Sequence, residues 1–409
     1  MKNLLTFLET SLTSFHAVAN AKTFLKERGF TSLDERDPWD LKEGGKYFVT
    51  RNGSSLIAFT FHKKGNFKIV ASHTDSPCFK LKESPEMQGN FTRLNVETYG
   101  GGLYYTFFDR PLRIAGRVIR EENGKLVSEL YASDETFVIP SVAIHMNREA
   151  NKQFAPDPQT DLLPLYALGE ATLKDAAFAR DLFVVPAEKP FINGANGEFL
   201  SSPRLDNLTS VCASLEAVSA QTNGVCVAAL FDNEEIGSRT RQGAGSDFLK
   251  NTLKRIALAQ NKSEEAFMQA LSSSLLVSLD NAHSLHPNRP EKCDPTNRAI
   301  MGGGIVVKAH ANGAYTSDAL TSAAIKKLFK DAGVKYQNFY NRSDMQSGST
   351  LGCISFTQIG VPSVDLGLAQ LAMHSAVETF APADYEELKK GLSAFYQSGI
   401  SVLENAVEL

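Results

Sequence analysis

The sequence contains no Cys-x-x-Cys pair, and its five cysteines are widely scattered and odd in number. A disulfide framework is therefore not expected, and free thiols are typical of a reducing compartment. No apolar run approaches the roughly 20 residues that a membrane-spanning helix needs. Polar residues also interrupt the apolar pattern at the amino terminus, which argues against a signal peptide. We therefore expect a cytoplasmic protein without a membrane partner.

A large excess of one charge is also missing. The formal net charge of the 409 residues is −4, which gives no electrostatic reason to expect binding to nucleic acid or to an anionic membrane. The motifs GxSxG and GxxxxGK[ST] and the dinucleotide fingerprint do not occur. Their absence disfavours a nucleophilic serine, a P-loop and a Rossmann-type cofactor site. The glycine triplets at 100–102 and 302–304 lack the residues that follow in such motifs, so they indicate turns or close packing.

The order of the predicted elements indicates an α/β domain that is interrupted once. The amino-terminal apolar residues recur at helical spacing up to Gly29, and strands are expected to follow and to lead to His73. From about residue 88 to 193 the sequence is rich in strand and turn signals, and the α/β pattern returns at about 194. The predicted fold class is α/β, with residues 1–87 and 194–409 forming one discontinuous domain and residues 88–193 forming an inserted β-rich domain.

The apolar run Val225–Phe231 predicts a strand that is buried on both faces. Two adjacent carboxylates, Glu234 and Glu235, follow its carboxyl end. Burying bare carboxylate charge is costly unless a partner compensates it, and a divalent metal ion with a water is the partner that this arrangement favours. At a turn both side chains can reach one site, so one can bind metal while the other acts as general base.

Other residues of metal-binding type lie in equivalent places, at or just after strand ends or at a helix start. Ligands in open α/β sheets collect beyond the carboxyl ends of the strands. Two imidazoles and three carboxylates suit zinc, although cobalt or manganese also fits such ligands. If one carboxylate bridges, the set divides into two sites whose ions can share a water and clamp a carbonyl oxygen. The five candidate ligands are His73, Asp206, Glu235, Asp280 and His374.

Each candidate also has an ordinary structural interpretation. A single histidine such as His73 more often caps a turn or packs in the core, and the helix dipole alone favours a carboxylate at a helix start, as at Asp206. The combination is therefore what indicates a metal site. Asp75 lies two residues after His73, on the same side of an extended chain, where its carboxylate can accept the second ring N–H of a metal-bound histidine. Alternatively, Asp75 only caps the turn before Pro77.

The candidate residues lie in five segments, which are SHTDSPCFKLK, RLDNL, FDNEEIGS, SLDNAHSLHPN and LAQLAMHSAVET. Taken together, these segments resemble the aspartyl aminopeptidase and vacuolar aminopeptidase I family of dinuclear-zinc metallopeptidases, and they run in the family's order over most of the chain. The resemblance implies an α/β/α zinc-peptidase domain with a mixed central sheet and an inserted β-rich dimerisation domain. It also implies peptide substrates and assembly into a homododecamer.

The resemblance implies a specific division of the metal ligands, with two zinc ions in each subunit. His73 and Asp280 would hold one zinc ion. Glu235 and His374 would hold the other ion, and Asp206 would bridge the two.

The resemblance also implies three catalytic residues. Glu234 would be the general base, and Asp75 would orient a metal-bound histidine. His145, in the segment AIHMNR of the inserted domain, would reach the active site of a neighbouring subunit and stabilise the oxyanion there.

The expected function is therefore that of a metalloaminopeptidase, which releases amino-terminal residues from peptides with a water activated by two metal ions. A dinuclear amidohydrolase or a carboxypeptidase acting on acylated amino acids would use the same chemistry. A catalytically silent cargo or scaffold protein is a further alternative, although such a protein would usually have lost Glu234 or one of the ligands. Lys308 either meets a substrate carboxylate or is a surface lysine at a strand end, so the preferred amino-terminal residue stays open.

Overall fold

The structure is a computed structural model that describes residues 1–173, 177–345, 348, 350, 352, 354 and 358–409. Within these residues the largest sheet is a mixed sheet of nine strands, in the order β1-β2-β3-β15-β4-β16-β20-β18-β19. Three neighbouring strands at its centre, β15, β4 and β16, run parallel. The strands are β1 (Thr31–Leu33), β2 (Lys46–Arg51), β3 (Ser55–Thr60), β4 (Phe67–His73), β15 (Val225–Phe231), β16 (Leu275–Leu279), β18 (Ile305–Lys308), β19 (Tyr336–Phe339) and β20 (Ser363–Gly367).

Helices cover both faces of this sheet. Side chains in a strand point alternately to opposite faces, and in β15 Ala228 and Leu230 join one hydrophobic core while Val227 and Ala229 join the other. This arrangement confirms the predicted α/β/α fold with a mixed sheet. The first core contains α1 (Lys2–Thr10), α2 (Ser14–Lys26), α3 (Leu205–Ser219), α6 (Ala319–Asp331) and α8 (Pro382–Gln397), and the second contains α4 (Phe248–Ala259) and α5 (Glu264–Ser272).

The amino-terminal helical stripe forms two helices rather than one. Helix α1 ends at Thr10, and α2 starts at Ser14 after Thr13, whose backbone is extended. The hydroxyl of Thr13 is 2.9 Å from Nδ1 of His16, and Nδ2 of Asn20 donates to the Thr10 hydroxyl. These side-chain hydrogen bonds satisfy polar groups at the break, which a pattern of apolar residues alone does not reveal. Among the described residues no helix has both the length and the apolarity to span a membrane.

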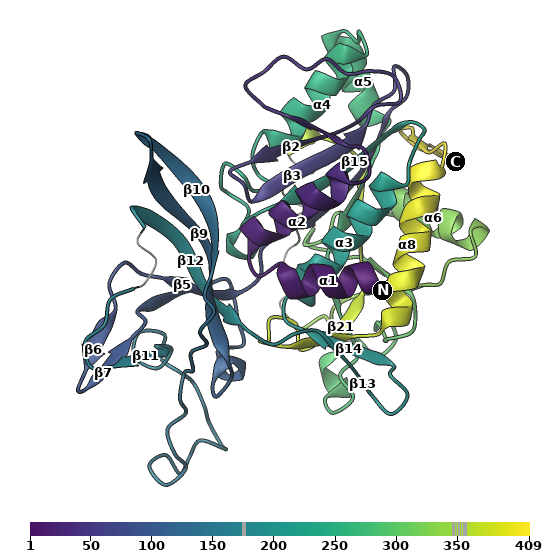
Figure 1. Cartoon of the computed structure of the whole chain (residues 1–409). Helices are drawn as coiled ribbons and strands as arrows, with labels where there is room; N and C mark the ends of the chain where they lie inside the picture. The colour runs from purple at the N-terminus through teal and green to yellow at the C-terminus, as the bar shows by residue number, and fades with distance from the viewer. Residues whose placement is uncertain (174–176, 346–347, 349, 351, 353, 355–357) are drawn as a thin grey trace.

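A β-rich part stands to one side of the α/β body (Figure 1). In the described residues it consists of a five-stranded sheet, β10-β9-β12-β5-β8, and a three-stranded sheet, β11-β7-β6. The first of these sheets already includes Cys78–Leu81, ten residues before the expected boundary at residue 88. The strands are β5 (Cys78–Leu81), β6 (Glu86–Gln88), β7 (Phe91–Arg93), β8 (Val96–Tyr99), β9 (Leu112–Glu122), β10 (Lys125–Ala132), β11 (Leu165–Leu168) and β12 (Ala179–Pro186). The predicted division into domains stays a prediction.

A smaller sheet joins distant parts of the chain. Its order, among the described residues, is β13-β14-β22-β21-β17. Pairing of β14 with β22 brings the segment before α3 next to the segment before α8. The strands are β13 (Phe191–Asn193), β14 (Phe199–Ser202), β17 (Ala282–His283), β21 (Ala369–Leu371) and β22 (Glu378–Phe380), and the carboxyl-terminal hairpin is β23 (Ser401–Val402) with β24 (Val407–Glu408).

His16 in α2 gives a testable pH dependence of stability. Burial, together with the positive charges of Arg204 and Arg113, lowers the pKa of His16 from 6.5 to about 4. The unfolded chain therefore takes up a proton before the folded chain does, so this contribution to stability is present above pH 6.5 and is lost as the pH falls toward 4. We expect a loss of about 2 kcal/mol between pH 7 and pH 5 from this residue.

The measurement compares wild type with His16→Asn by urea denaturation at several pH values, both proteins being metal-free. The loss of stability between pH 7 and pH 5 should be smaller in the variant by about the same 2 kcal/mol. Identical pH dependence in the two proteins would show that His16 does not resist protonation in the fold.

Candidate active site

Three of the predicted ligands lie at or just beyond the ends of three neighbouring strands. His73 is the last residue of β4 and pairs in register with Phe231, the last residue of β15. Just beyond β15 a short 3₁₀ helix, η2 (Glu234–Ile236), carries the two adjacent glutamates, and Asp280 directly follows β16. Because β15, β4 and β16 are parallel neighbours, their carboxyl ends open at the same edge of the sheet.

The structure brings together the five residues that were predicted to bind metal ions. Nε2 of His73 lies 3.3 Å from Oδ1 of Asp206 and 3.6 Å from Oδ1 of Asp280. Nε2 of His374 lies 3.5 Å from Oδ2 of Asp206 and 3.5 Å from Oε2 of Glu235. Asp206 therefore presents one carboxylate oxygen to each imidazole, and each imidazole has one further carboxylate beside it.

The donor atoms of this cluster fit a cation. One ligand atom from each of His73, Asp206 and Glu235 lies within 4.8 Å of the others. Oδ1 of Asp206 and Oε1 of Glu235 are buried, and they find no hydrogen-bond partner among the described residues. Buried polar atoms nearly always have a partner, and imidazole with carboxylate is a donor set that suits zinc. The residues present thus fit a zinc site.

The electrostatics of the cluster lead to the same conclusion. Burial and the neighbouring carboxylates raise the pKa of Glu234 to about 8, and burial also raises the pKa of Glu235 well above its ordinary value. Burial lowers the pKa of His374, but hydrogen bonding to Asp206 outweighs this effect and raises the pKa to about 10. The protein by itself therefore retains protons among these groups. Metal binding displaces such protons, since the ligands must be deprotonated.

Asp75 lies between the first histidine and the glutamate pair. Its Oδ1 is 3.5 Å from Nδ1 of His73, and its main-chain oxygen is 3.1 Å from the same nitrogen. The backbone N–H groups of Glu234 and Glu235 donate to its two carboxylate oxygens at 3.1 and 3.2 Å, and the hydroxyl of Tyr99 donates at 2.8 Å. One buried carboxylate thus ties the strand end at residue 73 to the turn at residue 234.

Sequence reasoning missed Glu378, which hydrogen-bonds to the backbone of two of the candidate ligands. Its side chain is buried, Oε2 accepts the backbone N–H of Asp206 at 2.9 Å, and Oε1 accepts the backbone N–H of His374 at 2.7 Å. These residues are 168 positions apart in the chain. The sequence did offer one signal, because Glu378 lies four residues after His374 within LAQLAMHSAVET. A glutamate that is buried among apolar residues needs a partner.

The first glycine triplet contributes directly to the site. The carbonyl oxygen of Gly101 accepts the Nδ1–H of His374 at 2.8 Å, which leaves Nε2 of that ring for the cluster. Gly100 has a φ of +73°, and a Cβ at this position would lie 3.0 Å from Cβ of Glu235. Of the two alternatives predicted for residues 100–102, turns or close packing, the close packing is confirmed at Gly100.

Two further residues that were considered from the sequence, His145 and Lys308, lie outside the cluster of imidazoles and carboxylates. His145 is exposed in the β-rich part, in a turn. Lys308 is 1% exposed, and its Nζ donates to the main-chain oxygens of Asp280 at 2.9 Å and Asn281 at 3.2 Å. The alternative that Lys308 is a surface lysine is therefore wrong, because its ammonium group holds the segment that carries Asp280.

Comparison with known proteins gives consistent results along the whole chain. The Probable M18 family aminopeptidase 2 of Clostridium acetobutylicum is 42% identical, in an alignment that covers 97% of this chain and 98% of that protein. A chain in the cryo-EM structure of the Ape4 and Nbr1 complex has a TM-score of 0.91 at 33% identity, with 97% of this chain and 85% of that chain covered. The S. cerevisiae mApe1 dodecamer gives a TM-score of 0.83 at 25% identity, with coverage of 97% and 96%.

A protein-family model also matches this chain. The model described as aminopeptidase I zinc metalloprotease (M18) matches residues 7–177 and 174–396. The matched residues include every member of the buried cluster of imidazoles and carboxylates. The chain therefore belongs to the aminopeptidase I zinc metalloprotease family, M18.

Proposed function

We propose that this M18 aminopeptidase cleaves the amino-terminal peptide bond at the cluster beyond β4, β15 and β16, with two zinc ions in each subunit. The observation that carries the proposal is the position of Asp206, whose two carboxylate oxygens face His73 and His374 separately. This geometry supports a shared ligand between two ions. The proposed division is His73 with Asp280 for one ion and Glu235 with His374 for the other, and cobalt or manganese suits the same donors.

In this proposal, side chains of the protein transfer the proton and orient a metal-bound histidine. Zinc bound at this cluster would polarise the carbonyl group and make a water acidic near neutral pH. Glu234 would accept the water proton and deliver it to the departing nitrogen, and its pKa of about 8 in the protein alone is compatible with exchange near neutrality. Asp75 would orient His73 through its contacts with Nδ1.

Glu378 is expected to be a positioning residue for metal binding. Glu378→Ala would leave the backbone N–H groups of Asp206 and His374 without their acceptor and would loosen both ligand segments. Outer-shell partners of this kind typically change metal affinity about 10–100-fold, and we expect a zinc affinity weaker by that amount. Competition titration against a fluorescent chelator measures it directly, without reference to activity.

Two further variants make the Glu378 experiment specific. Glu378→Gln keeps one oxygen acceptor and should show an intermediate loss. Glu265→Gln changes an exposed glutamate on α5 and should bind zinc as wild type does. Unchanged affinity in Glu378→Ala would show that the two ligand segments are held by other contacts.

The test of the activity uses three matched substrates. An aminoacyl anilide with a free α-amine should be hydrolysed, whereas its N-acetyl form and an acylated amino acid with a free carboxylate should not. The family assignment does not favour the amidohydrolase or carboxypeptidase alternative. Faster cleavage of either acylated compound would overturn the proposed aminopeptidase chemistry, and a panel of aminoacyl anilides would give the preferred amino-terminal residue.

We propose further that the chain self-associates through residues 88–193, as an inserted domain, into a homododecamer. The similarity to the mApe1 dodecamer supports this proposal. Exposed apolar side chains in the β-rich part also support it, including Leu126 and Leu130 on β10 and Met146 and Phe178, because large exposed apolar areas mark interaction surfaces. His145 lies in the same part, exposed, and would act in a neighbouring subunit's site.

A cytoplasmic location is part of the same proposal. The cysteines among the described residues, Cys78, Cys212, Cys226 and Cys293, are all free thiols. Unpaired cysteines are usual where glutathione and thioredoxin keep thiols reduced.

A further inference from the structure

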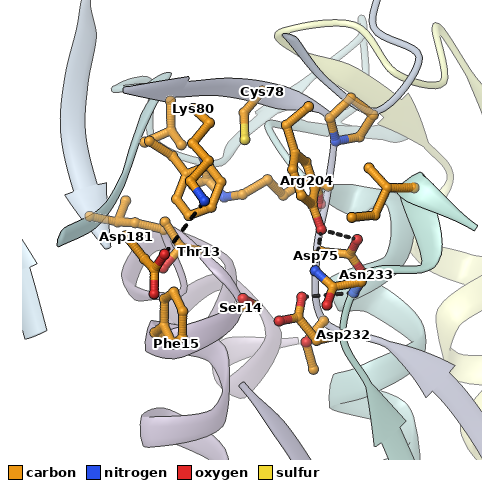
Figure 2. Close-up of a pocket in the computed structure, with 18 of the residues that line it drawn as sticks. Thr13, Ser14, Phe15, Asp75, Cys78, Lys80, Asp181, Arg204, Asp232 and Asn233 are labelled. Carbon is orange, nitrogen blue, oxygen red and sulfur yellow. Dashed lines mark hydrogen bonds and ion pairs between the residues drawn. The ribbon is translucent and has the colours of Figure 1, made fainter. Parts of the chain in front are cut away.

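A cavity lies beside the candidate active site, between the turn that joins α1 to α2 and the β-rich part. Its volume is about 580 Å³, which is in the range of small-molecule sites. Figure 2 shows this cavity, with Cys78 and Lys80 on one side and Asp232 and Asn233 on the other. None of the five candidate metal ligands lines it, so this cavity is separate from the metal cluster.

Arg204 is a buried cation in the wall of this cavity, and among the described residues no carboxylate lies within ion-pair distance of it. Its side chain is 8% exposed. Nε has no hydrogen-bond partner among the described residues, and Nη1 has one weak contact, 3.4 Å from the carbonyl oxygen of Pro186. A guanidinium carries five N–H donors, and an unpaired charge in a buried place is costly. Such a group indicates a ligand with a carboxylate, which matches the planar fork of arginine.

The other two basic side chains of the cavity share one ion-pair partner, Asp181. Nζ of Lys80 lies 3.5 Å from Asp181, and Nη2 of Arg117 lies 2.8 Å from the same carboxylate. Arg204 therefore differs from both, because no carboxylate lies within ion-pair distance of it in the described part of the chain.

Asp232 is the complementary group on the opposite side of the cavity. It is 3% exposed, and it has no basic side chain within ion-pair distance in the part of the chain that is described. Its Oδ1 accepts the backbone N–H of Asn233 at 2.8 Å. Burial, together with the negative charge of Asp75, raises the pKa of Asp232 to about 7. One buried cation and one buried carboxyl group, each without a charged partner among the described residues, thus face the same space, and apolar side chains of Phe15, Phe183 and Val185 complete its wall.

We propose that this cavity binds a small zwitterion of the amino-acid type, with its carboxylate on Arg204 and its ammonium group on Asp232. An apolar side chain would pack against the phenylalanines. The cavity also touches Asp75 and Asn233, and Asp75 in turn contacts His73 and the backbone of the glutamate pair. Asp75 thus connects the cavity to the metal cluster. We therefore expect the rate of peptide hydrolysis at the cluster to change when the cavity is occupied.

The first test locates the ligand in the wild-type protein. Crystals of the zinc-loaded protein are soaked with 4-bromo-L-phenylalanine after an amino-acid hydroxamate has filled the metal site. We expect anomalous bromine density in the cavity and the ligand carboxylate at Arg204. A cavity that holds ordered water alone, or density found at crystal concentration without measurable binding in solution, would overturn the proposal.

The second test measures affinity in solution by calorimetry on the same hydroxamate-blocked protein. L-phenylalanine should bind, whereas its amide and its N-acetyl derivative should each bind about 10-fold more weakly or worse, because each lacks one charge. Arg204→Gln should show a similar loss. Lys80→Gln is the matched control and should bind as wild type does, because Lys80 is already paired with Asp181. Equal binding of the three compounds, or full affinity in Arg204→Gln, would contradict the assignment.

Discussion

Glu234→Gln is expected to lower turnover by about 10²–10⁴-fold while the bound metal is retained. The amide has nearly the same shape as the carboxylate, and the backbone N–H of residue 234 would still donate to Asp75. A carboxamide cannot accept a proton from water, however, so the proposed base is lost and the ligands are unchanged. Steady-state rates on an aminoacyl anilide and the metal content of the same preparation provide the measurement.

The control for Glu234→Gln is Glu265→Gln, which changes an exposed glutamate far from the cluster and should keep its activity. If Glu234→Gln hydrolysed the substrate at the wild-type rate, Glu234 would have no part in proton transfer. If it were inactive and also free of zinc, its role would be that of a ligand.

Asp206→Asn should have a different effect, because it should remove metal as well as activity. The amide offers one oxygen instead of two, and its nitrogen is not a ligand, so His73 and His374 would no longer share an acceptor between them. We expect the zinc content to fall from two ions toward one or none in each subunit, with activity lower by about 10³-fold or more, since catalysis by a two-metal site depends on both ions. Metal analysis after gel filtration, together with circular dichroism, separates this outcome from unfolding.

These two variants form a matched pair. Loss of activity with metal retained identifies a base, and loss of activity with metal lost identifies a ligand. Asp206→Asn with two bound zinc ions and normal rates would refute the shared-ligand arrangement, whatever the result for Glu234.

The strands and the meeting point of the ligands could be predicted from the sequence because local patterns determine them. The apolar run Val225–Phe231 predicted β15, and it is buried along its whole length. His73, Glu235 and Asp280 follow runs of the same kind. Parallel neighbours end at one edge of a sheet, so residues that follow such runs were expected to meet.

The features that sequence reasoning missed depend on contacts between distant segments. The role of Glu378 arises only when β22 pairs with β14, and no local pattern predicts that pairing. Likewise β5 belongs to the β-rich sheet because it pairs with β12, about 100 residues later. The burial of Lys308 depends on the position of the main-chain oxygens that follow β16. The spacing of apolar residues shows which face of a helix or strand is buried, but it does not show which other element packs against that face.

The contact between Gly101 and His374 bears on any attempt to make a smaller catalyst from this protein. Excising the β-rich segment would leave the α/β body with its strands intact, yet the imidazole at position 374 would lose the carbonyl group that selects its tautomer. The ring could then rotate and offer either nitrogen to the metal. A shortened protein would need another hydrogen-bond acceptor for Nδ1 of this ring. The β-rich segment is therefore needed for the geometry of the site, even in a monomer.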